Sequence, residues 1–380
     1  MSAEPHLTAI MGRMWRNSLG VVAGMLGCLG LAAETSALRP TMGAIRWDAW
    51  HGQRGGPGRA VERSLGPSQW HYRLPFFAKV LSPSAVSIDG SSPEVMDREI
   101  AYAAKAGIDY WAFVTYDAKD PMSLGLANYL KSRRKRGLRF CLISEQQRWG
   151  GPDTYEGHTR RLVALMRMPS YLRVAGARPL LYLGFISDET TASRWGGIQG
   201  FRKAVDDMRR LARESGAGDP YIAIMDPIAT RAAMLRRQLG ADAVSAYAVQ
   251  GGDARAPYSK LAAYARRFWD DCASTGSAVI PIAMSGWDRR PRVERPVPWE
   301  TWQEPGAGLD VYYQAPTPAE LASHVEEAFR WIDQHPQASP ARTALVYAWN
   351  ENDEGGWLVP TLGEGTKRLD ALRHLLRPAR

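Results

Sequence analysis

Apolar runs alternate with amphipathic stretches along most of this chain, and no other feature restricts its fold as strongly. Eight short runs are typical of buried parallel strands, at residues 42–47, 110–115, 139–144, 180–185, 221–225, 243–248, 279–284 and 344–349. The stretches between them have helical spacing, as in Leu321, Val325, Ala328, Phe329 and Ile332. Eight strand-helix units predict an α/β chain folded as a (β/α)8 barrel, the TIM barrel.

Two connections are too long to be simple turns. Residues 51–92 follow the first predicted strand and residues 285–317 follow the seventh, and both are rich in glycine, proline and aromatic residues. Since both follow strand ends, we expect them to cover the C-terminal mouth of the barrel. No linker interrupts the pattern, so residues 38–380 are predicted to form one domain, and we expect a monomer.

The start of the chain has the outline of a secretory signal peptide. Two arginines precede an apolar run at residues 19–33, and small residues follow up to Ala37. The run is shorter and richer in glycine than a membrane-spanning helix of about 20 residues. We therefore predict cleavage of residues 1–37, no membrane span, and a secreted or periplasmic protein. Alternatively, a loose resemblance to a bacterial lipoprotein cleavage site predicts a lipid anchor at Cys28.

The basic charge does not require a polyanionic partner. The net charge of +9 comes mostly from arginine, with one cluster at residues 131–136 in the last turn of a predicted helix. Cations at that place complement the helix dipole, so we interpret the cluster as a solvated helix end. No nucleic-acid motif is present, and we predict no nucleic-acid partner.

Two glutamates follow the last predicted strand. In the segment 348–357, AWNENDEGGW, Glu351 and Glu354 are three residues apart, and they can share a pocket only if the strand ends near Asn350 and the chain turns. Gly355 and Gly356 permit such a turn. A glycosidase needs one protonated and one ionised carboxyl group, so we predict that this pair is catalytic. The competing interpretation is a pair of solvated loop acids.

Other polar and aromatic residues follow the strand ends, where the binding loops of α/β barrels lie. The predicted substrate-binding residues are Asp48, Trp50, Tyr116, Asp117, Glu145, Asp226, Tyr247, Trp287, Asp288, Asn350 and Trp357. Alternatively, Asp226 caps the next helix and Asp117 is an ordinary turn residue.

Other chemistries have little support in the sequence. It contains no GxSxG elbow, no GxxxxGK[ST] phosphate loop, no GxGxxG fingerprint and no HExxH motif. The seven histidines are scattered. We predict an enzyme without a cofactor and without a metal.

The segment from Asn350 to Gly355 resembles the Asn-Glu-Trp-x-Glu-Gly signature of the glycoside hydrolase family 99-like superfamily, which includes proteins labelled WbsX-type glycosyltransferases. Residues 106–110, 178–182 and 286–292 add to the resemblance, which extends over most of the predicted barrel. It implies a retaining glycosidase of the endo-α-mannosidase type. It also implies that Glu351 deprotonates the sugar 2-hydroxyl and that Glu354 is the general acid/base.

The chain departs from that signature at Asn352, where the family has tryptophan. The departure bears on sugar specificity, and Trp349 or Trp357 can supply the missing ring. Our hypothesis is an exported glycoside hydrolase that acts on an oligo- or polysaccharide. Two alternatives stay open, a non-catalytic carbohydrate-binding barrel and a glycosyltransferase-like protein of polysaccharide assembly.

Overall fold

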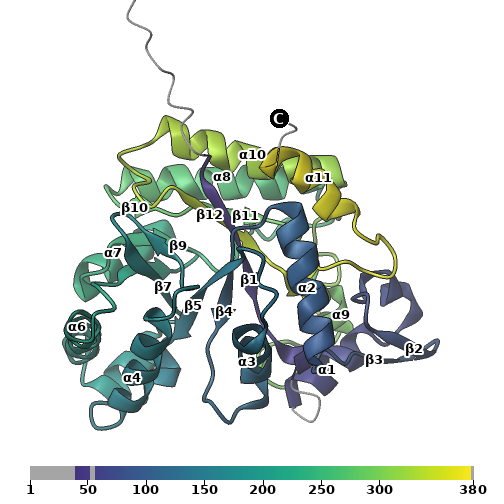
Figure 1. Cartoon of the computed structure of the whole chain (residues 1–380). Helices are drawn as coiled ribbons and strands as arrows, with labels where there is room; N and C mark the ends of the chain where they lie inside the picture. Colours follow the sequence, from purple (N-terminus) through teal and green to yellow (C-terminus); the bar gives the residue numbers. More distant parts are fainter. Residues whose placement is uncertain (1–38, 52–55, 378–380) are drawn as a thin grey trace, which may run out of the picture. The chain divides into compact units, whose positions relative to one another are not determined.

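Parallel strands form a curled sheet at the centre of this computed structural model, which describes residues 39–51 and 56–377 (Figure 1). The predicted signal peptide and Cys28 lie outside the described residues. The strands of the sheet are β1 (Thr41–Arg46), β4 (Tyr110–Val114), β5 (Arg139–Glu145), β7 (Arg178–Gly184), β8 (Tyr221–Met225), β9 (Ala243–Ser245), β10 (Ala278–Val279), β11 (Ile282–Met284) and β12 (Thr343–Tyr347). Their order is β10-β9-β8-β7-β5-β4-β1-β12-β11.

The two ends of this order are successive pieces of one strand. β10 pairs with β9 and β11 pairs with β12, and only Ile280 and Pro281 separate them. Pro281 has no N–H to donate, which interrupts the strand, but its carbonyl still accepts from Leu345 N at 2.9 Å. The nine strands of this order therefore occupy eight positions around a closed barrel. The predicted (β/α)8 barrel is confirmed, with each strand close to its predicted place.

Helices follow the strands and pack around the sheet (Figure 1). They are α2 (Pro93–Ala106), α3 (Leu124–Lys131), α4 (Tyr155–Met166), α5 (Asp188–Trp195), α6 (Ile198–Glu214), α7 (Ala229–Leu239), α8 (Tyr258–Ser274), α10 (Pro318–Gln334) and α11 (Lys367–Leu376). Local signals set their ends. Thr317 and Glu320 form a capping box at the start of α10, for example, and Gly107 ends α2 with φ +91°. Because α3 ends at Lys131, the rest of the basic cluster follows the helix.

The two long connections carry their own elements. The first contains α1 (Gly56–Leu65) and the hairpin of β2 (Lys79–Ser82) and β3 (Ala85–Ser87), and the second contains α9 (Arg290–Glu294). The short strand β6 (Arg173–Val174) pairs antiparallel with β7. In the part of the chain that the structure describes, no helix is both long and apolar enough to span a bilayer.

The barrel interior is filled with large side chains. Tyr110 and Tyr182 are fully buried, and their hydroxyl groups lie 3.0 Å apart. A Cβ atom at Gly43 would overlap the Tyr110 ring, so glycine at this position of β1 lets the ring fit inside the barrel. The interior is therefore a packed core, and a ligand has to bind at the strand ends.

A buried ion-pair network lies at the C-terminal end of β1. Arg46 donates from Nε to Asp48 at 2.7 Å and from Nη2 to Glu99 at 2.8 Å, and Trp349 Nε1 donates to Glu99 at 2.8 Å. Burial alone would raise the pKa of Glu99, but Arg46 and His51 lower it from the ordinary 4.5 to about 2. Glu99 is thus the buried counterion that ties α2 to the barrel.

We expect Glu99→Gln to lower the free energy of unfolding by about 3 kcal/mol at pH 7, because it leaves Arg46 with one buried counterion fewer. Urea titration measures the change, with Glu94→Gln, on the exposed face of the same helix, as the control that changes it by about 0.5 kcal/mol or less. The depressed pKa of Glu99 contributes stability above pH 4.5 that is lost as the pH falls toward about 2. The difference between variant and wild type should shrink over that range, and a constant difference would contradict the ionic explanation.

Candidate active site

The segment after β12 forms a tight turn. β13 (Asn350–Glu351) pairs antiparallel with β14 (Gly356–Trp357), and a 3-10 turn over Asn352–Glu354 joins them. Gly355 has φ +90°, and a Cβ atom there would overlap the backbone of Asp288, so only glycine fits. The chain leaves the barrel strand and turns here, as the sequence predicted, and both glutamates reach one cavity.

This cavity has a volume of about 710 Å³ and lies at the C-terminal ends of the barrel strands. Both long connections contribute to its lining, the first through Pro57 and the second through Arg292, Trp299, Glu300 and Trp302. Six residues singled out in the sequence also line it, namely Tyr116, Glu145, Tyr247, Trp287, Glu351 and Glu354. The structure thus brings the predicted carboxylates together with four of the predicted binding residues.

The other seven predicted binding residues do not line the cavity. They are Asp48, Trp50, Asp117, Asp226, Asp288, Asn350 and Trp357. Asp48 turns toward Arg46, and Trp50 is 2% exposed and packs against Phe77 at a ring distance of 5.9 Å. Asp117 is exposed on the surface.

The remaining four hold the loops together. Asp226 accepts from Ile228 N at 2.9 Å and pairs with Arg231 on α7, but the N-cap residue of that helix is Ile228 and no side chain caps it, so the helix-cap alternative is wrong. Asp288 pairs with Arg73 and Arg290. Asn350 bonds the backbone of Trp47 with both ends of its amide, at 3.0 and 2.6 Å. Trp357 is buried beneath Arg368, whose guanidinium lies 3.8 Å from the ring centroid. These side chains already have protein partners, which is why they do not face the cavity.

Arg292, on α9, stands at the centre of the acidic residues. Its Nε donates to Asp353 at 2.7 Å, and its Nη2 donates to the same carboxylate at 3.1 Å. Nη2 also lies 3.4 Å from Glu351. Nη1 contacts Glu354, and it donates to Glu300 at 2.9 Å. Arg292 was not among the site residues predicted from the sequence. The signal available was its place in the segment 286–292 that carries the family resemblance.

The cluster contains more acidic than basic groups. The carboxylates of Glu300, Glu351, Asp353 and Glu354 contact the guanidinium groups of Arg289 and Arg292. With every group charged, four negative and two positive charges would leave −2 in a buried space, so a bound proton is favoured. Burial, and next the charge of Glu354, raise the pKa of Glu351 well above its ordinary value, although Arg292 opposes the shift. Burial also raises the pKa of Glu300.

Two tyrosines donate to the two glutamates. Tyr247 donates to Glu351 Oε1 at 2.6 Å, and Tyr347 donates to Glu354 Oε2. Burial, and next the adjacent carboxylates, raise the pKa of both phenols well above the ordinary value, so both stay protonated. The tyrosine rings contact each other edge to face at 5.8 Å. Each glutamate is therefore held by a cation and by a phenol, which restrict its orientation.

Aromatic side chains surround the cavity opening. Trp47 donates from Nε1 to the Tyr116 hydroxyl at 2.6 Å, and its ring meets Trp299 edge to face at 5.5 Å. Trp299 is 40% exposed and Trp302 is 65% exposed. Exposed flat rings beside carboxylates suit a ligand with both apolar faces and hydroxyl groups, as a sugar has.

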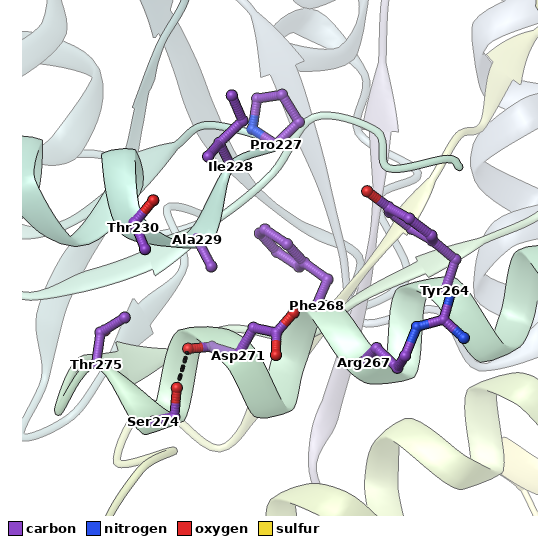
Figure 2. Close-up of a pocket in the computed structure, with 10 residues that line it drawn as sticks. All are labelled: Pro227, Ile228, Ala229, Thr230, Tyr264, Arg267, Phe268, Asp271, Ser274 and Thr275. Carbon is purple, nitrogen blue, oxygen red and sulfur yellow. Dashed lines mark hydrogen bonds between the residues drawn. The ribbon is translucent and has the colours of Figure 1, made fainter. Parts of the chain in front are cut away.

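A second cavity, of about 390 Å³, lies between the start of α7 and the helix α8 (Figure 2). Thr230, Tyr264 and Arg267 are among its lining residues, and Asp271 is its one carboxylate. It lacks a carboxylate pair, so the larger cavity is the candidate active site. Across residues 39–51 and 56–377, no three histidine, cysteine or acidic side chains are grouped as a metal site would require.

No family model and no curated protein matches this chain. Among solved structures it is similar to a family 99 endo-α-mannosidase from Bacteroides thetaiotaomicron, with 14% identity, 84% of this chain and 88% of that chain covered, and a TM-score of 0.48. It is also similar to a β-glucuronidase from Parabacteroides merdae, with 12% identity, 77% and 37% covered, and a TM-score of 0.42. At these identities and TM-scores the alignments carry no information on substrate or mechanism.

Proposed function

We propose that this protein is a glycoside hydrolase that cleaves a glycosidic bond in an oligo- or polysaccharide, with Glu351 and Glu354 as its catalytic carboxyl groups. One observation carries the proposal. Two glutamates from one turn reach the same aromatic-lined cavity, within a carboxylate cluster whose charge favours a bound proton. A protonated and an ionised carboxyl group side by side are what glycoside hydrolysis needs.

The surroundings of the two glutamates support different roles. The raised pKa of Glu351 favours the protonated form of its carboxyl group, which suits it to protonate the leaving oxygen. Glu354 contacts both Arg289 and Arg292, which stabilise a carboxylate. We therefore propose Glu351 as the general acid and Glu354 as the ionised partner. This is the reverse of the roles that the family resemblance implies.

Retention of configuration is part of the proposal. Both glutamates contact the same guanidinium group, Glu351 at Nη2 and Glu354 at Nη1, which keeps the carboxyl groups close together. Retaining enzymes have the closer carboxyl pair, because inverting enzymes leave room for a water molecule. Proton NMR of the first product formed distinguishes the two outcomes.

A second candidate function is carbohydrate binding without catalysis. The observation that favours it is the ion pairing of both glutamates with the buried Arg292, since such pairs also occur as structural elements. Under this alternative the aromatic rim binds sugar and the carboxylates only hold the turn. Both candidates include export through the predicted signal peptide at residues 1–37.

Product analysis with a panel of glycans tests the proposal. The purified protein is incubated with α-mannans, α-glucans and acidic polysaccharides, and α-mannans come first because the resemblance implies an endo-α-mannosidase. Release of shorter oligosaccharides by wild type, lost in Glu351→Gln and Glu354→Gln, supports the hydrolase. Binding of a glycan by all three proteins without any cleavage supports the binding barrel.

A further inference from the structure

Phe185 has an unusual backbone conformation for an aromatic residue. It directly follows β7 and has φ +54°, in the left-handed region. In that region the Cβ atom crowds the following carbonyl oxygen, and bulky side chains rarely adopt it. Glycine would adopt this conformation without the steric cost, so the presence of phenylalanine at this position requires a reason.

Packing does not supply that explanation. The Phe185 side chain is 51% exposed and lines the larger cavity, so much of its ring faces the space a ligand would occupy. Its protein ring contact is edge to face with Tyr247, at a centroid distance of 5.3 Å and an interplanar angle of 63°. An edge contact with Tyr247 leaves ring surface available to a ligand.

The barrel order places Phe185 across the cavity from the glutamates. β7 and β12 are four positions apart in either direction around the eight-position barrel, so their ends lie on opposite sides of its mouth. Tyr247, after β9, connects the two sides, since its ring contacts Phe185 and its hydroxyl donates to Glu351. A ligand that spans the cavity from Glu351 to the opposite wall would therefore lie against Phe185.

We propose that Phe185 is a stacking platform that binds one sugar ring of the substrate and positions it against Glu351. This inference rests on the proposed carbohydrate function. The apolar C–H face of a pyranose lies on the Phe185 ring, while its hydroxyl groups face the carboxylates and tyrosines. The left-handed backbone at this position directs the ring into the cavity.

Phe185→Gly tests the inference because it removes the ring and the backbone strain together. We expect the affinity for the bound oligosaccharide, measured by calorimetry in the Glu351→Gln background, to fall about tenfold. The midpoint of thermal unfolding should stay the same or rise. Phe185→Tyr keeps a flat ring and should bind as wild type, whereas Phe185→Leu should bind as weakly as the glycine variant.

Arg136→Gly is the matched control. Arg136 also has a positive φ, +51°, but it is an exposed residue after α3, away from both cavities. The Arg136→Gly variant should gain thermal stability, and its affinity for the oligosaccharide should not change. Equal affinity of wild type and Phe185→Gly would overturn the platform, and so would full binding by Phe185→Leu.

The failure of this inference can be told from failure of the proposed function. If no glycan of the panel binds to the wild-type protein, the carbohydrate function itself fails. If wild type binds and Phe185→Gly binds equally well, the function stands and only the platform is wrong. In a hydrolytically active protein, loss of the platform should raise KM about tenfold with a smaller change in kcat.

Discussion

Glu351→Gln is expected to hydrolyse natural glycans about 10²- to 10⁴-fold more slowly than wild type. Glutamine keeps the size of the side chain and can still accept a hydrogen bond from Tyr247, but its amide has no acidic proton to transfer to the leaving oxygen. The raised pKa of Glu351 is the physical basis, because it favours the protonated form of this carboxyl group where an ordinary glutamate has ionised. Initial rates of product release measure the loss.

An aryl glycoside with an activated leaving group assigns the two roles. Such a leaving group needs no protonation, so Glu351→Gln should retain substantial activity toward it, whereas Glu354→Gln should lose activity toward both substrates. The opposite pattern would assign the acid to Glu354, as the family resemblance implies. Glu304→Gln, an exposed change on the same long connection as Arg292, is the control and should match wild type.

Arg292→Leu is expected to lower the free energy of unfolding by about 3–5 kcal/mol at pH 7, because it leaves buried carboxylates without their shared cation. The Arg292 side chain is 4% exposed and contacts four acidic residues, so neither water nor another cation easily replaces it. Hydrolysis should be lost as well, since the glutamates lose the group that holds them. Urea titration and product analysis measure the two effects.

The pH dependence of Arg292→Leu distinguishes electrostatics from packing. A carboxyl group whose folded pKa lies above its ordinary value contributes stability below pH 4.5 that is lost as the pH rises through the folded pKa. Removing the Arg292 cation raises the pKa of Glu351 further, so the free energy of unfolding of the variant should approach the wild-type value in acid and fall below it toward neutral pH. A destabilisation that does not vary with pH would indicate lost packing instead.

Arg290→Leu is the matched control for Arg292→Leu. Its side chain is 29% exposed and pairs with Asp288, which keeps Arg73 as a second cation. We expect a loss of about 1 kcal/mol or less, because solvent screens this pair and Asp288 is not left alone. An equal loss in both variants would show that the central place of Arg292 has no special effect.

The spacing of apolar residues and the residues that begin and end helices were sufficient to predict the barrel from the sequence. Strands that are buried on both faces and helices with one apolar stripe have different spacing, and that difference is local. The turn at Gly355 was readable for the same reason, since few other residues adopt its backbone conformation. The main departure was the seventh strand, which Pro281 divides into β10 and β11.

The sequence by itself determined the barrel, its two long connections and the turn that carries Glu351 and Glu354. Only the tertiary structure decided which polar residues at the strand ends face the cavity. Asp48 follows β1 but pairs with Arg46, within a network completed by the distant Glu99, while Glu145, the last residue of β5, lines the cavity. The physical reason is that a buried charge takes the nearest suitable partner in space, and contacts between residues far apart in the chain determine that partner.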